Sequence, residues 1–239
     1  MTNAFRCCFS ALVTTASFSA SADILKLGNE PQAAPFISGP QKIETRQGRC
    51  HYSLVLGKSF HARYNDPEII LYQSPLPLKD DQIPHLEQAE TSSGYYWMFS
   101  NPGSKKTNWF GLMCDSVENF PFGTDSNSEA PPELEQALES NGIKCPAELR
   151  DGKFFPKARL FRSKDYSFKR ISYNNWNGFI ITHKAGQSEY YDQIRFCLTH
   201  NDRVIVGATE NQSPLPKIDN KFPDEVEGIL KTLVFSEDN

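Results

Sequence analysis

Six cysteines are the residues of this chain whose type and spacing most directly suggest chemistry. Cys7 and Cys8 lie in an N-terminal stretch that we expect to be removed from the mature protein. The remaining ones are Cys50, Cys114, Cys145 and Cys197. They form no C-x-x-C pair, and only His51 and His200 lie near any of them, so disulfides are favoured over a zinc site. These cysteines allow three pairings.

Two histidines are candidates for a metal or hydrolytic site. His183 and His200 end neighbouring strand candidates, and antiparallel pairing of those strands would bring the two rings close together. The sequence specifies no third ligand, so a surface or structural role is the alternative. His51 and His61 flank a predicted hairpin and offer a weaker signal of the same kind.

Motifs of well-known enzymes are absent from the sequence. It contains neither the Gly-x-Ser-x-Gly turn of serine hydrolases nor the glycine-rich loops that bind nucleotides. Glu189 and Asp192 are possible paired carboxylates for glycosidic chemistry, but nothing positions them across a substrate. We therefore assign no catalytic residue, no metal and no cofactor.

One loop has the composition of a binding surface. Residues 173–178 read Tyr-Asn-Asn-Trp-Asn-Gly, and tyrosine and tryptophan are enriched at interface hot spots. We predict that Tyr173, Asn175 and Trp176 contact a partner protein. Core packing is the alternative, because aromatic side chains in strands and turns are usually buried.

Residues 1–22 are typical of a secretory signal peptide. Arg6 supplies the basic region, residues 7–19 are mostly small or apolar, and Ala20-Ser21-Ala22 fits a cleavage site. This predicts a periplasmic or secreted protein, in which cysteines oxidise. No later run is long enough to be a transmembrane segment. The net charge of -4 argues against a broad surface for nucleic acid.

The first half of the mature chain reads as a leader followed by strands and a helix. Residues 23–47 contain three prolines and are predicted to form an extended leader. Residues 51–64 read as a hairpin, with Gly57-Lys58 as its two-residue turn. Further predicted elements are strands at 68–72, 95–99 and 108–114 and a helix at 132–140, which Gly142 can close.

The second half reads as an antiparallel meander closed by a helix. Turns separate five strand-like segments, at 158–162, 168–173, 178–183, 190–198 and 203–209. A helix is predicted at 223–233, because Pro223 and acidic residues begin it and apolar residues recur at helical spacing.

The order cysteine, strands, cysteine, helix occurs twice along the chain. It predicts an α+β fold of two tandem lobes, at residues 48–143 and 144–239, each an antiparallel sheet with a packed helix. Each lobe would contain one internal disulfide, which favours Cys50 with Cys114 and Cys145 with Cys197. A second repeat, Gln-Ser-Pro-Leu-Pro at 73–77 and 212–216, has a different register and predicts extended connectors.

Residues 168–235 resemble the closing portion of PsbP/Mog1-type α+β domains. The resemblance rests on the turn with Trp176 and Gly178, aromatic and apolar strands at 190–197 and 204–209, and a terminal helix. Two-lobed periplasmic immunity proteins of type VI secretion systems are similar in arrangement. This similarity implies a protein inhibitor without catalysis, and it transfers no individual site residue.

The sequence therefore predicts a periplasmic binding protein, most concretely an immunity protein that binds and inhibits a secreted antibacterial effector. Two alternatives remain open. One is a secreted hydrolase whose non-contiguous site surrounds His183 and His200. The other is a periplasmic carrier that holds an apolar ligand inside a lobe.

Overall fold

The computed structural model describes residues 24–91, 94–102, 108–122, 132–157, 163–210 and 215–237. The predicted signal peptide, the strand predicted at 158–162 and most of the second Gln-Ser-Pro-Leu-Pro segment lie outside these residues. Strands make up 53% of the structure and helices 13%.

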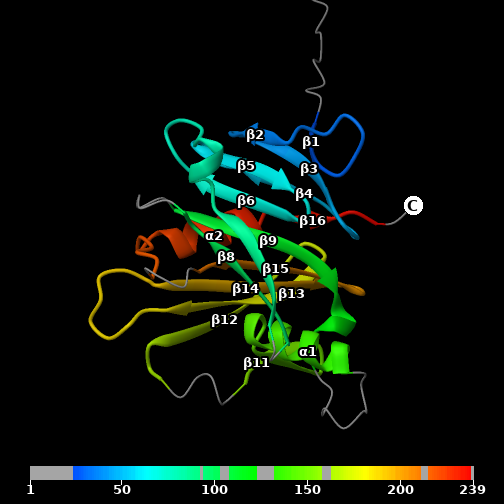
Figure 1. Ribbon diagram of the computed structural model, residues 1–239, viewed down its shortest axis with the longest axis vertical. Helices are drawn as coiled ribbons and strands as arrows, with labels where there is room; N and C mark the ends of the chain where they lie inside the picture. Colours follow the sequence, from blue (N-terminus) through cyan, green and yellow to red (C-terminus); the bar gives the residue numbers. More distant parts are fainter. Residues whose placement is uncertain are drawn as a thin grey trace, which may run out of the picture.

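Figure 1 shows the elements in their order along the chain. The strands before the first helix are β1 (Leu25–Gly28), β2 (Phe36–Ser38), β3 (Gln41–Gln47), β4 (Cys50–Leu56), β5 (Phe60–Asn65), β6 (Glu68–Gln73), β7 (His85–Thr91), β8 (Gly94–Ser100) and β9 (Trp109–Ser116). Those after it are β10 (Ala147–Arg150), β11 (Lys153–Pro156), β12 (Tyr166–Tyr173), β13 (Trp176–His183), β14 (Gln193–His200), β15 (Arg203–Thr209) and β16 (Val234–Phe235). The helices are α1 (Pro132–Lys144) and α2 (Phe222–Leu230), with short 3-10 turns η1 (Asp80–Gln82) and η2 (Val117–Asn119).

An eight-stranded sheet forms the centre of the fold, in the order β12-β13-β14-β15-β9-β6-β5-β2. Strand β9 pairs with β6 on one side, where Tyr72 lies opposite Trp109. On its other side it pairs with β15, where Ala208 lies opposite Gly111. Both pairings are antiparallel, so one sheet contains strands from both predicted lobes.

Smaller sheets cover this central sheet. A four-stranded sheet has the order β1-β3-β4-β16, and β7 pairs with β8 and β10 with β11. In Figure 1, β8 crosses in front of β9 and β15, whereas α2 lies behind the central sheet. The central sheet is therefore covered on both faces.

Alternation along the central strands separates two hydrophobic cores. On β6, Ile69 and Leu71 belong to the core that contains α2 and the four-stranded sheet. Their neighbours Ile70 and Tyr72 belong to a second core, which contains Trp97 and other residues of the β7–β8 side. Successive residues of a strand point to opposite faces of the sheet. Because both faces are covered here, a central strand such as β6 contains a continuous apolar run rather than alternating apolar and polar residues.

Two glycines in adjacent central strands make room for aromatic rings. A Cβ atom on Gly207 of β15 would lie 1.9 Å from the Phe196 ring of β14, and one on Gly111 of β9 would lie 2.2 Å from the Phe99 ring. Both rings are fully buried and cannot move away into solvent. The close packing of the sheet depends on the missing side chains.

The two-lobed α+β fold predicted from the sequence is wrong. The structure is mostly β, with large multi-strand sheets and two helices among the described residues. The prediction assumed that each group of strands forms its own sheet with the helix that follows it. Instead, β9 pairs with β6 from the first half on one edge and with β15 from the second half on the other. The boundary predicted between residues 143 and 144 falls at the end of α1, and as a domain boundary it stays a prediction.

The hairpin predicted at 51–64 is also wrong, although both of its strands exist. Strand β4 pairs with β3 and β16, whereas β5 pairs with β2 and β6 in the central sheet. The two-residue turn required a positive φ at Gly57, but the left-handed residue is Ser59, with φ 68°. The chain thus passes from one sheet to the other.

Residues 23–47, predicted as an extended leader, form β1, β2 and β3 within the described part. The predicted meander of the second half is present as β12 to β15, joined in sequence order. The helix predicted at 223–233 corresponds to α2. The helix predicted at 132–140 continues through Gly142 to Lys144.

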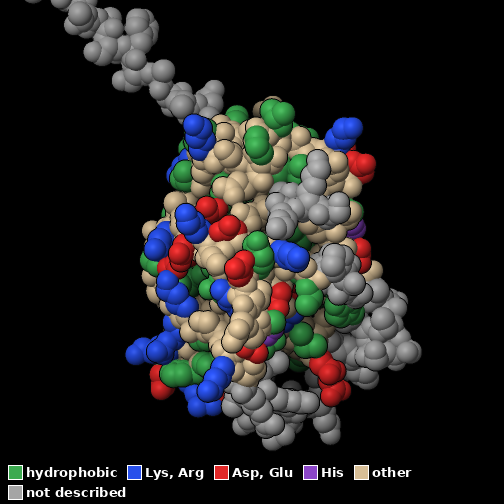
Figure 2. Space-filling model, turned by 90° about the vertical axis from the view of Figure 1, so that its left-hand side faces the viewer, with side chains coloured by type: hydrophobic (Ala, Val, Ile, Leu, Met, Phe, Trp, Pro, Cys, Tyr) green, Lys and Arg blue, Asp and Glu red, His purple; other side chains and the backbone are tan. Residues whose placement is uncertain are grey.

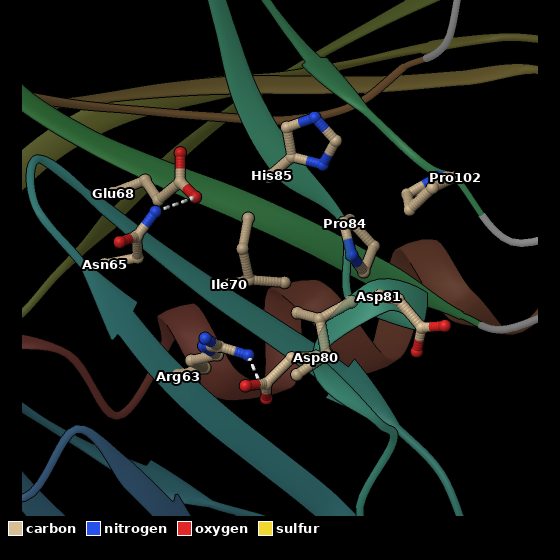
Figure 3. Close-up of a pocket in the computed structure, with 10 residues that line it drawn as sticks. Arg63, Asn65, Glu68, Ile70, Asp80, Asp81, Pro84, His85 and Pro102 are labelled. Atoms are coloured by element: carbon tan, nitrogen blue, oxygen red, sulfur yellow. Dashed lines mark hydrogen bonds and ion pairs between the residues drawn. The ribbon is translucent and has the colours of Figure 1, made fainter.

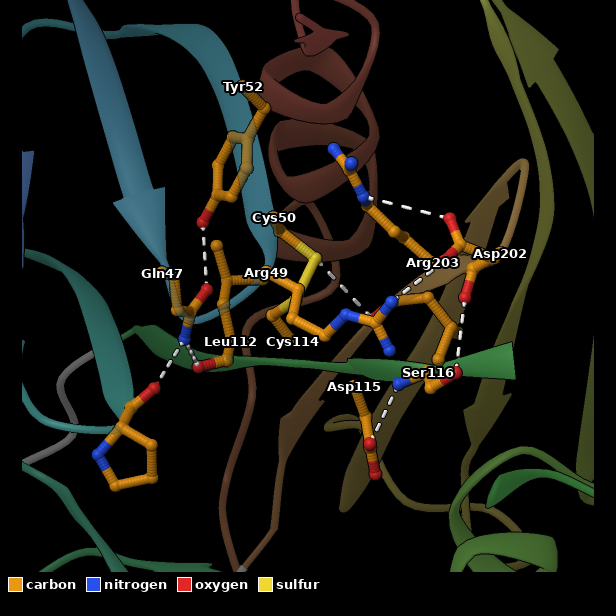
Figure 4. The surroundings of a disulfide bond; sticks show 12 residues. Gln47, Arg49, Cys50, Tyr52, Leu112, Cys114, Asp115, Ser116, Asp202 and Arg203 are labelled. Carbon is orange, nitrogen blue, oxygen red and sulfur yellow. Dashed lines mark hydrogen bonds and ion pairs between the residues drawn. A yellow bond between two sulfur atoms is a disulfide. The ribbon is translucent and has the colours of Figure 1, made fainter. Parts of the chain in front are cut away.

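Two disulfides connect separate parts of the fold. Cys50 of β4 is bonded to Cys114 of β9, which joins the four-stranded sheet to the central sheet. Cys145, directly after α1, is bonded to Cys197 of β14. These are the pairs that the order of cysteines and strands favoured. Beside the first bond, the Gln47 amide donates to the carbonyl oxygens of Leu112 and Pro67 at 2.7 and 2.8 Å (Figure 4).

A buried ionic network joins α1 to the end of β15. Lys144 is 2% exposed and pairs with Glu210, whose other carboxylate oxygen lies 3.1 Å from Arg195. The Lys144 ammonium also lies 4.8 Å from the centre of the Trp97 ring. Burial lowers the pKa of Lys144 to about 8, against the opposing attraction of Glu210.

The outer surface has mixed charge on the side in Figure 2, where lysine and arginine side chains lie beside aspartate and glutamate side chains. Within the described ranges, no helix is both long and apolar enough to cross a membrane.

Replacing Gly207 with Ala should destabilise the protein by about 1–3 kcal/mol, because the new methyl group overpacks the core against Phe196. Gly228→Ala is the matched control, because a Cβ atom there meets nothing within 4 Å. That change should be neutral or slightly stabilising in a helix. Urea denaturation measures both, and equal effects would contradict the packing role of Gly207.

Removing the Cys50–Cys114 disulfide by replacing both residues with Ala should lower the free energy of unfolding by about 4 kcal/mol, since the bond closes a long loop in the unfolded chain. Its cysteines are 64 residues apart. Thermal denaturation of the oxidised wild type and the double variant measures the loss. An unchanged melting temperature would show that the bond does not hold the two sheets together.

Candidate functional site

Two neighbouring depressions lie where β5 and β6 meet the segment that contains η1. The first has a volume of about 380 Å³ and the second about 340 Å³. Arg63, Asp80 and Ile83 line both of them. We call the two depressions together the Arg63 groove.

Arg63 and Asp80 form an ion pair between the two depressions. The Arg63 guanidinium lies 2.6 Å from the Asp80 carboxylate, and the two side chains are 29% and 88% exposed. Arg63 comes from β5 and Asp80 from η1. An ion pair this exposed contributes little to stability, so its partners remain available to other groups.

Glu68 lies on the opposite side of the first depression (Figure 3). It is 3% exposed. Its carboxylate accepts hydrogen bonds from the Asn65 amide at 3.2 Å and the Leu86 backbone N–H at 2.5 Å. Burial raises the pKa of Glu68, and the hydrogen bonds from Asn65 and Leu86 oppose that shift.

The floor of the first depression is apolar. Ile70 and Ile83 are 1% and 6% exposed, and Figure 3 shows Ile70 between the Glu68 side and the Pro84 side. Pro102 lies at one wall, on the same side as Pro84. The depression thus combines an apolar floor with a charged rim, which is the anatomy of many binding sites.

His61 holds together the walls of the second depression. Its ring stacks between Phe36 and Tyr72, with centroid separations of 5.6 and 5.1 Å. Nδ1 lies 2.8 Å from Ser38 Oγ, and Nε2 lies 3.1 Å from the Ser74 carbonyl oxygen. A carbonyl only accepts, so Nε2 must carry a hydrogen. His61 therefore connects β2 to the start of the loop at residues 74–79.

That loop contains the first Gln-Ser-Pro-Leu-Pro segment and presents an exposed leucine. Leu76 is 74% exposed, the highest value among the large hydrophobic side chains of the described chain. The next residues, Pro77 and Leu78, line the second depression. Prolines on both sides restrict the backbone, so Leu76 is held outward with little conformational freedom to lose on binding.

The loop predicted as a partner contact lies elsewhere, between β12 and β13. The Tyr173 hydroxyl donates to Glu227 at 2.8 Å. The Asn175 amide donates to the Phe235 carbonyl at 2.7 Å, and the buried Trp176 indole donates to the Leu233 carbonyl at 2.9 Å. All three residues therefore hold the C-terminal segment against the sheet. Partner contact through them remains a prediction.

The structure does not bring His183 and His200 together. In the pairing of β13 with β14, His183 lies opposite Gln193, whereas His200 lies at the far end of β14. His183 Nδ1 is 2.5 Å from Asp192, and His200 Nδ1 is 2.6 Å from the Asn175 carbonyl. The shared site that antiparallel pairing suggested is therefore wrong, and Asp192 pairs with histidine rather than with Glu189.

The described ranges contain no group of three histidine, cysteine or carboxylate side chains arranged to hold a metal ion. The four cysteines among the described residues are all in disulfides.

Sequence reasoning missed Arg63, Glu68, Asp80 and Asp81 as a group. The available signal was a polar, proline-rich stretch directly after a strand, because loops of that composition often carry binding residues. Ser-Pro-Leu-Pro at 74–77 favours a connector, and as a binding epitope it is only a weak signal.

Comparisons of the chain with protein-family models, with curated proteins and with solved structures give no match.

Replacing Glu68 with Gln should remove part of the pH dependence of stability. The raised pKa of Glu68 means that the folded state favours its protonated form, so its ionisation costs stability as the pH rises above the ordinary value of 4.5. Wild type should therefore lose more stability than Glu68→Gln between pH 4.5 and 7. Urea denaturation across that range measures the difference, and parallel curves would contradict it.

Proposed function

We propose that this protein is an extracytoplasmic binding protein that attaches to a protein partner through the Arg63 groove. Most concretely, it is an immunity protein that neutralises a secreted antibacterial effector. The groove is the observation that carries the proposal, because it joins two depressions across one accessible arginine.

The chemistry of the groove supports recognition of a protein surface. Arginine is among the residues that most often dominate binding energy, and such residues are usually surrounded by apolar contacts that exclude water. Arg63 has Ile83 beside it in both depressions and Phe36 and Leu78 in the second. Leu76 extends the apolar contact beyond the groove.

The two disulfides support the compartment, since structural disulfides persist where thiols are oxidised. Such a compartment is where an immunity protein would meet an incoming effector. The net charge of -4 favours a basic effector through electrostatic steering, which accelerates association more than it strengthens the complex.

The direct experiment mixes the purified, oxidised protein with effectors encoded beside its gene. A stoichiometric complex and loss of effector toxicity are expected. If every neighbouring effector stays free in size-exclusion chromatography and keeps its toxicity, the proposal is overturned.

In that complex, Arg63→Ala should weaken binding about tenfold or more, as expected for a central arginine. Arg46→Ala is the matched control, because Arg46 is also an ion-paired arginine, with Glu30 at 3.2 Å, but lies on β3 away from the groove. It should change the affinity less than about twofold. Biolayer interferometry measures both, and equal affinities for the two variants would remove Arg63 from the interface.

A further inference from the structure

Two carboxylates in the first depression, Glu68 and Asp81, form no ion pair with a described residue, although Arg63 and His85, which line the same depression, attract Glu68 electrostatically. Among the described residues, no lysine, arginine or histidine lies within ion-pair distance of Glu68 or Asp81. Glu68 is almost completely buried, and its hydrogen-bond donors, Asn65 and the Leu86 backbone, are uncharged. Burial of the Glu68 carboxylate outweighs these attractions, so a further cation that enters the depression would relieve the cost of the buried charge.

Arg63 compensates Glu68 only in part, because Asp80 shares its charge at 2.6 Å while Glu68 feels it from further away. Once that pair is counted as neutral, Glu68 and Asp81 give the depression a net negative charge. Figure 3 places them on different sides of Ile70, with the Asp81 carboxylate directed away from it. Both negative charges favour a cation in the depression over a carboxylate.

The size and floor of the depression fit one long side chain. About 380 Å³ is at the lower end of the volumes of ligand pockets. Ile70 and Pro84 offer an apolar surface along which a methylene chain can lie. Lysine and arginine combine such a chain with a charged end, and both commonly bury the stem while the charge meets polar groups.

We propose that the first depression receives a lysine or arginine side chain from the partner protein, with its stem on Ile70 and Ile83 and its charge attracted by Glu68 and Asp81. This inference rests on the proposed function, since it names the chemistry of the segment that enters the Arg63 groove. The occupant is an exposed basic segment of a folded protein.

The second depression specifies the neighbouring residue of that segment. Its walls include Pro35, Phe36, Pro77 and Leu78, which are apolar. Because both depressions share Ile83 and the Arg63–Asp80 pair, a residue next to the cation reaches the second depression. The preferred segment therefore places an apolar residue beside its lysine or arginine.

Short peptides test this chemistry without the partner. The probe is N-acetyl-Leu-Lys-Leu amide, compared with peptides that carry norleucine or glutamate in place of lysine. Titration of the ¹⁵N-labelled protein should shift the backbone amide signals of Asp81, Ile83 and Leu86 in a saturable manner. The norleucine peptide should bind at least about tenfold more weakly, which corresponds to about 1.4 kcal/mol, and the glutamate peptide should not bind measurably.

Variants of the two carboxylates complete the test. Asp81 is exposed, so Asp81→Asn should fold normally, and it should lower the affinity for the lysine peptide about threefold or more. Glu68→Gln should lower that affinity further. Asp224→Asn, an exposed change on α2, is the control and should leave binding unchanged. Equal binding of the lysine, norleucine and glutamate peptides, or no binding of any, overturns the inference.

The outcome is separable from that of the proposed function. Lysine-peptide binding without any effector complex supports the basic-segment site and rejects the immunity role. An effector complex whose affinity is unchanged by Asp81→Asn and Glu68→Gln supports the immunity role and rejects this site.

Discussion

The hydrogen-bond ladders on the two edges of β9 are the interaction on which the rest of the structure depends. They set the register of β6 on one side and of β15 on the other. Glu68 and Ile70 share one face of β6 because they are two residues apart, and that face belongs to the β7–β8 side of the sheet. A slip of one residue would turn both side chains to the opposite core, and the first depression would lose its floor and its buried carboxylate together.

A second constraint on the central sheet is the buried carboxylate of Glu210, directly after β15. It receives an ion pair from Lys144 and another from Arg195, so α1, β14 and β15 meet at one buried carboxylate. The Phe99 backbone N–H also lies 3.4 Å from this carboxylate, which brings β8 to the same point. Buried charges of this kind tolerate few alternative arrangements, since removing one partner leaves the others uncompensated. The network therefore helps to define how the second core is covered.

Local elements could be predicted from the sequence, but their pairing could not. The meander from β12 to β15 was readable because short turns such as Asn174-Asn175 connect strands that pair with their sequence neighbours. For β4 and β5, the same pattern of two strands and a short link gave a wrong hairpin, because alternation does not indicate which sheet a strand joins. The Arg63 groove was missed for a related reason. Its residues come from four strands (β2, β5, β6 and β7), a 3-10 turn and the connecting segments, and only the tertiary fold brings Glu68 and Asp81 to one depression.

The position of β9 also affects how the chain can fold while it is being made. Its partner β6 precedes it, but β15 begins 87 residues after Ser116 ends the strand. As the chain emerges from its N-terminus, one edge of β9 therefore remains open until most of the second half has appeared. An open edge of this kind can pair with another chain. The growing chain is therefore most prone to aggregation after β9 has emerged and before β15 has emerged. A chaperone that shields open strand edges would act in that interval.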